Sequence, residues 1–67
     1  MKVVDYQTKA MTIMFWSTNK RYELEELIKQ AKNDNELNDA EKELAMEKIR
    51  HEVGDITFRK VMQIARM

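Results

Sequence analysis

The stretch LEELIKQA, residues 24–31, decides the fold, because its apolar residues recur with the period of an α-helix. They stand at i, i+3, i+4 and i+7: Leu24, Leu27, Ile28 and Ala31. This spacing gives a helix with one apolar face for a core and charged residues on its other sides. The polar run Asn33-Asp34-Asn35 should end this helix.

The rest of the chain offers little chemistry for turns between strands. It has no proline and one glycine, and only Asn33-Asp34-Asn35 and Gly54-Asp55 look like turns. Glu, Lys, Leu, Met and Ala are abundant, and they favour helix. We therefore expect an all-α fold, a small bundle of three to four short helices that forms a single domain over residues 1–67.

The clearest helix start in the sequence lies at Asn38. Asn38 can cap a helix and Glu41 stands at the N3 position, which resembles a capping box. The apolar stripe expected along this helix is Ala40, Leu44, Ala45, Ile49 and Val53. Gly54 can stop the helix in the left-handed conformation.

A fourth helix should follow, with Asp55 as its cap. Its apolar residues again fall at i, i+3, i+4 and i+7, and two isoleucines widen that face: Phe58, Val61, Met62 and Ala65, with Ile56 and Ile64.

Residues 3–16 fit neither period cleanly. A helix would place Val4, Met11 and Phe15 on one face, with Met14 beside them, whereas alternation over 13–16 would also suit a strand. We favour helix, because a lone strand would have nothing to pair with.

Ser17-Thr18-Asn19 offers three N-caps in a row and leaves two arrangements open. In the first, these residues separate two helices. In the alternative, one long helix runs through them, the chain forms a two-helix hairpin, and two hairpins pack as a dimeric four-helix bundle. Such a dimer could bind RNA across its helices.

Length and composition set further limits. A chain of 67 residues buries only about 60% of the surface that its unfolded form exposes. It has no cysteine, so disulfides are excluded, and self-association or a larger partner is the expected aid to stability. The lack of cysteine fits the cytoplasm. No apolar run approaches the ~20 residues of a membrane span.

Charge is unevenly placed along the chain. Residues 1–22 carry four bases and one acid, residues 23–55 carry eleven acids and five bases, and residues 56–67 carry three bases. The acidic centre is suited to a partner with a basic surface. The acidic residues expected to face solvent and bind it are Glu36, Asp39, Glu43 and Glu47, and the expected aromatic anchors are Phe15 and Trp16.

Catalysis and cofactor chemistry find little support in the sequence. The chain has one histidine and no glycine-rich loop for phosphate. His51, with Glu47 and Asp55 one turn away on either side, could hold a metal weakly, but an ordinary surface histidine is the favoured interpretation. The basic ends are too small for autonomous nucleic-acid binding. We expect a protein that is not an enzyme and has no cofactor, with nucleic-acid contact only weak or indirect.

The chain resembles the Hha/YmoA family of small helical proteins from enteric bacteria and their plasmids. The similar stretches are Leu24-Glu25 with Ile28, and Asn38-Asp39 with Glu41. Five positions would match without a gap from 38 to 65: Asp39, Glu41, His51, Thr57 and Lys60. The family's Ala-Asp-His-Arg reads here as Ile49-Arg50-His51-Glu52.

The resemblance implies a modulator of gene expression that docks through acidic residues on an H-NS-type nucleoid protein. The broader interpretation is a small phage- or plasmid-encoded inhibitor of a host protein.

Overall fold

Four α-helices make up the computed structural model, which describes the backbone of residues 2–65 and the side chains of residues 2–63. In chain order they are α1 (Lys2–Trp16), α2 (Lys20–Lys32), α3 (Asp39–Val53) and α4 (Asp55–Ala65). No strand occurs between residues 2 and 65. The prediction of a small all-α bundle of short helices is therefore confirmed.

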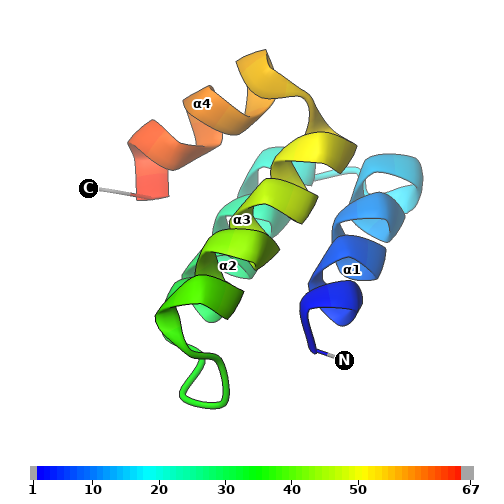
Figure 1. The fold of residues 1–67 in the computed structure, drawn as a ribbon. Helices are drawn as coiled ribbons and strands as arrows, with labels where there is room; N and C mark the ends of the chain where they lie inside the picture. Colours follow the sequence, from blue (N-terminus) through cyan, green and yellow to red (C-terminus); the bar gives the residue numbers. More distant parts are fainter. Residues whose placement is uncertain (1, 66–67) are drawn as a thin grey trace.

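The helices α2 and α3 form the centre of the bundle (Figure 1). Both contact each other and both remaining helices, whereas α1 and α4 make no contact with one another over the described residues. Neighbouring helices α1 and α2 run antiparallel, as do α2 and α3, and α4 crosses one end of the central pair. In Figure 1, α1 lies to the right of the central pair, and α4 runs across the upper end of the pair toward the left.

The core lies between these helices and takes residues from all of them. Its buried members are Val3, Tyr6, Ala10, Leu24, Leu27, Ile28, Ala31, Leu37, Ala45, Ile49, Val53 and Val61. The apolar face predicted for residues 24–31 is confirmed, since all four of its residues are buried. Ile13, Met14, Met46, Phe58 and Met62 pack around this core and stay partly exposed.

The chain breaks between α1 and α2, as the first of the two arrangements requires. Ser17 closes the last turn of α1 with a bond to Ile13, and its hydroxyl accepts the Asn19 N–H at 3.0 Å. Asn19 holds the N-cap position of α2, although its side chain makes no capping bond. The continuous helix that the hairpin alternative needs is not observed.

The capping box at the start of α3 is confirmed. The Asn38 side chain accepts the Glu41 N–H at 2.8 Å, and the Glu41 carboxylate accepts the Asn38 N–H at 3.1 Å. The predicted apolar stripe of this helix was partly wrong, because Ala40 is exposed and Leu44 remains 42% exposed. The other three predicted members, Ala45, Ile49 and Val53, are buried.

Gly54 ends α3, with its N–H donating to the Arg50 carbonyl at 2.8 Å. Its φ of 92° and ψ of 150° lie in a region open essentially to glycine alone, not in the left-handed helical region that was predicted. Asp55 is the first residue of α4 rather than a cap before it, and its carboxylate pairs with Arg50 at 3.1 Å.

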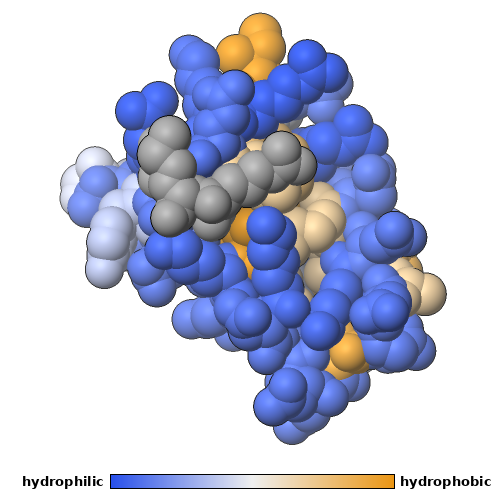
Figure 2. All heavy atoms as spheres, turned by 90° about the vertical axis from the view of Figure 1, so that its left-hand side faces the viewer, coloured by the Kyte–Doolittle hydropathy of each residue, from blue (hydrophilic) through white to orange (hydrophobic). Residues whose placement is uncertain are grey.

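The face predicted for the fourth helix is confirmed in part. Val61 is buried, and Phe58 and Met62 pack against the core. Ile56 does not belong to this face, since it is 74% exposed. The side chains of Ile64 and Ala65 lie outside the described residues. Figure 2 shows hydrophobic atoms emerging between hydrophilic ones on the side of the molecule where α4 lies.

The apolar residues of α1 divide between two faces of the helix. Val4, Met11 and Phe15 point outward, whereas Val3, Tyr6 and Ala10 are buried. Neighbouring side chains of a helix point about 100° apart. A helix that buried Val4 in place of Val3 would therefore be rotated by about 100° about its axis.

A polar network at the start of α1 accounts for this orientation. The Tyr6 hydroxyl donates to the Asp34 carboxylate at 2.7 Å, and Lys2 Nζ lies 3.0 Å from Asp34 and 2.9 Å from Glu36. The Tyr6 bond, the Glu36 N–H and Lys2 together lower the pKa of Asp34 to about 2. Burial and the bond to Asp34 raise the pKa of Tyr6 to about 12.

We predict that Asn38→Ala destabilises the fold by about 1 kcal/mol, because it removes a side-chain cap from α3. Asn35→Ala is the matched control, since Asn35 is an exposed amide of the same loop. Urea unfolding followed by circular dichroism measures both variants. Equal stability of the two variants would mean that the cap contributes nothing.

We also predict that the folded protein loses stability in acid, because Asp34 becomes protonated there. Its pKa is lowered in the folded state, so its contribution is complete above the ordinary value of 3.8 and disappears as pH falls toward about 2. Asp34→Asn should lower stability at neutral pH and flatten the decline over this range, whereas Asp39→Asn should keep it. Free energies of unfolding measured at a series of pH values decide between these results.

Candidate functional site

Three of the four acidic residues predicted to bind a partner lie in line on α3. Asp39, Glu43 and Glu47 follow one another at intervals of four residues and are all exposed. Glu36 is also exposed, in the loop before α3. The structure therefore places the predicted acidic face at the surface.

Ion pairs neutralise both ends of this face. Glu36 pairs with Lys2, and Glu47 pairs with Arg50. Among the described residues no ion pair is found for Asp39 or Glu43. The charge left for a partner is therefore concentrated on these two carboxylates, one helical turn apart.

The residues around His51 do not form a metal site. Arg50 binds both Glu47 and Asp55, the two acids that would have to join His51 around a cation. Within the described residues, no group of three metal-binding side chains comes together. The hollow at this place has a volume of about 320 Å³ and is lined by Arg50 and its acidic partners, along with His51 and Gly54.

Among the side chains of residues 2–63, the two predicted aromatic anchors are the most exposed large hydrophobic residues, at 77% for Phe15 and 81% for Trp16. Because they are consecutive in a helix, their side chains point about 100° apart. They therefore belong to two different sides of α1 and do not form one joint patch.

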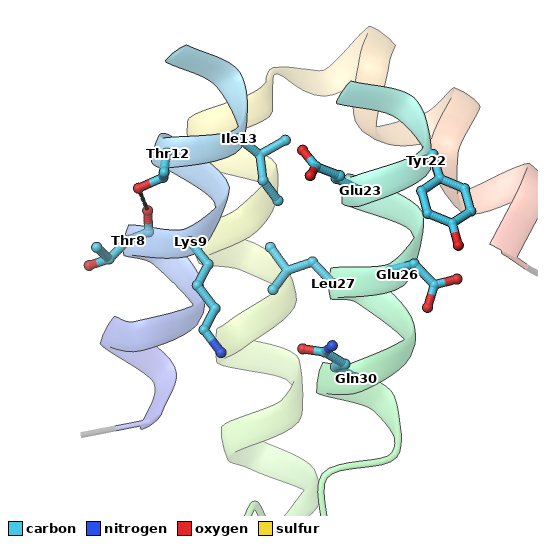
Figure 3. Close-up of a pocket in the computed structure, with 9 residues that line it drawn as sticks. All are labelled: Thr8, Lys9, Thr12, Ile13, Tyr22, Glu23, Glu26, Leu27 and Gln30. Atoms are coloured by element: carbon cyan, nitrogen blue, oxygen red, sulfur yellow. Dashed lines mark hydrogen bonds between the residues drawn. The ribbon is translucent and has the colours of Figure 1, made fainter. Parts of the chain in front are cut away.

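A groove between α1 and α2 has a volume of about 560 Å³ (Figure 3). Its lining comes from both helices: Thr8, Lys9, Thr12, Ile13, Tyr22, Glu23, Glu26, Leu27 and Gln30. Two of the four residues that α1 contributes to the lining are threonines. Thr12 also donates its hydroxyl to the Thr8 carbonyl at 3.0 Å, so this polar group is already satisfied within the helix.

Figure 3 shows how the lining is divided. Ile13 and Leu27 approach each other between the two helices and form an apolar floor. Glu23 points from α2 into the groove near Ile13, while Glu26 stands at the outer edge. No ion pair is found for either glutamate within the described part of the chain, so the α2 wall carries unpaired negative charge.

The lower end of the groove carries a cation. Lys9 extends toward this end in Figure 3, and its Nζ lies 5.6 Å from the centre of the Tyr6 ring. The charge at the groove therefore changes along its length, from acidic near Ile13 to basic below Leu27.

Trp16 lies on the same side of α1 as the groove. Lys9, Thr12 and Ile13 line the groove, and Trp16 continues their row at i+7, i+4 and i+3. Side chains in such a row share one helical face. The exposed indole therefore stands just past the acidic part of the groove.

The groove was not predicted from the sequence. The signal that could have indicated it is the row Lys9, Thr12, Ile13 and Trp16, which mixes short polar and apolar residues at helical spacing. That row indicates a face of α1, but it does not say which helix lies opposite. The opposite wall became known only from the packing of α2.

No protein-family model, no curated protein and no solved structure matches this chain. The resemblance to the Hha/YmoA family thus stays a prediction. None of the helices in residues 2–65 combines the length and apolar character that a membrane span requires.

The indole of Trp16 gives a direct test of this site, because Trp16 is the only tryptophan of the chain. Its emission should lie at the long wavelength of a hydrated indole and change little in wavelength when urea unfolds the protein. Iodide should quench it nearly as well in the folded state as in the unfolded state. A short-wavelength, protected emission would contradict the exposed position.

Proposed function

We propose that this chain is a non-catalytic binding protein whose docking site for another protein is the groove between α1 and α2. The observation that carries the proposal is the exposed Trp16 beside a groove with an apolar floor and an acidic wall. A tryptophan in such a position is costly to leave in water, and tryptophan is among the residues that most often dominate protein interfaces.

The chemistry of the groove defines the partner segment. An apolar side chain would rest on Ile13 and Leu27, and a lysine or arginine would meet Glu23 and Glu26. A cation that reaches past this wall would also find the face of the Trp16 indole, and such contacts contribute about 0.5–1 kcal/mol at exposed sites. The best fit is a short amphipathic helix with basic residues beside its apolar ones.

The acidic face of α3 supports a second candidate. Asp39 and Glu43 lack ion pairs among the described residues and would steer a basic protein surface toward α3. The resemblance to the Hha/YmoA family would make that partner an H-NS-type nucleoid protein, and the chain a modulator of gene expression. An inhibitor of a host protein encoded by a phage or plasmid would use the same chemistry.

Matched charge reversals separate the two candidates. Immobilised protein is incubated with nuclease-treated lysate of its native cells, and captured proteins are identified by mass spectrometry. Glu23→Lys with Glu26→Lys changes the groove, while Asp39→Lys with Glu43→Lys changes α3 by the same charge. Circular dichroism shows that each variant is folded.

We predict that the groove reversal removes the captured protein and that the α3 reversal retains it. Trp16→Ala should weaken binding of that protein by about 2 kcal/mol or more, as expected for a central aromatic anchor. The opposite pattern of loss would favour the acidic face of α3 and an H-NS-type partner. Capture that survives both reversals and Trp16→Ala would contradict the proposal.

A further inference from the structure

The outer side of α1 carries an uncharged stripe, and most of this stripe lies outside the groove. Val4, Thr8, Met11 and Phe15 follow one another along this side, and all four are exposed. Of these, only Thr8 also lines the groove. The stripe therefore adjoins the groove at Thr8, and its other three residues lie outside the groove.

The stripe carries no charge, although charged residues make up 36% of the chain. The three charged residues of α1 are placed elsewhere: Lys2 pairs with Asp34 and Glu36, Lys9 lines the groove, and Asp5 lies off the stripe. A surface without charge gives a strongly charged partner nothing to pair with. It fits another uncharged helix face, and a second copy of the chain presents one.

The stripe is also complementary to itself when its direction is reversed. The spacings between its residues are four, three and four, which read the same in both directions. In an antiparallel pair of α1 helices, Phe15 would therefore lie against Val4 of the second copy, and Met11 against Thr8. Each large side chain meets a smaller one, as close packing across a two-fold axis requires.

We propose that two copies of this chain associate through antiparallel packing of their α1 stripes. The contact is isologous, so it closes as a dimer.

The small size of the contact indicates a weak association. A standard interface buries about 800 Å² on each partner, which is roughly a sixth of the 4816 Å² surface of this protein. α1 has 15 residues, about four turns, and one helix of this length covers less than that. The dimer should therefore be weak and form between micromolar and millimolar concentration.

Sedimentation equilibrium over this concentration range tests the proposal with the full chain. The wild-type mass should rise from 8.1 kDa toward twice that value. Phe15→Asp should keep the protein monomeric at all concentrations, because it buries a carboxylate against Val4 of the second copy. Ile56→Asp is the matched control, since Ile56 is an exposed apolar residue of α4 away from the stripe, and it should dimerise like the wild type.

A charge pair tests the antiparallel register. Val4→Lys added to Phe15→Asp should restore the dimer, because the new lysine of each copy meets the new aspartate of the other. In a parallel pair the same double variant would set like charges together. A wild-type protein that stays monomeric, an equal loss with Ile56→Asp, or a double variant that remains monomeric would each overturn the proposal.

Discussion

The buried face of α2 is the constraint on which the rest of the structure depends. Leu24, Ile28 and Ala31 have no exposed surface, and α2 contacts every other helix. Burial of aliphatic side chains contributes about 1.5–3 kcal/mol each, which is much of what a small core can supply. Because α2 and α3 fill the centre, α1 and α4 each have only one side against the core and must expose the other.

The attachment of α1 shows how this constraint leads toward function. The helix contains nine apolar residues, more than one inward face can hold. Polar contacts of Tyr6 and Lys2 with Asp34 fix which residues turn inward, so the remaining apolar ones face water. These include Val4, Met11 and Phe15 on one side and Trp16 on another. Both proposed surfaces, the groove and the dimer stripe, follow from this orientation of one helix.

The sequence predicts the elements that depend on local chemistry. The apolar period of α2, the capping box at Asn38 and the stop at Gly54 can all be read within a few residues, and the structure contains each. The exposed positions of Phe15, Trp16 and the acidic residues of α3 also follow the pattern of the sequence.

The sequence does not predict features that depend on distant residues. The inward face of α1 depends on contacts with distant residues, such as the hydrogen bond between Tyr6 and Asp34, which are 28 residues apart. The partial exposure of Leu44 depends on how α3 packs against the other helices. The groove depends on the packing of α1 beside α2, and the ion pairs that neutralise Glu36 and Glu47 require the folded chain.

The two valines at the start of α1 test the central claim, that α1 turns its second apolar side outward. They are adjacent in sequence, yet Val3 is 1% exposed and Val4 is 49% exposed. Nuclear Overhauser contacts of their methyl groups, measured in dilute protein, report this difference directly. This orientation predicts contacts from Val3 methyls to core side chains of α2 and α3, and none from Val4 methyls to that core. Core contacts from Val4 in place of Val3 would contradict it.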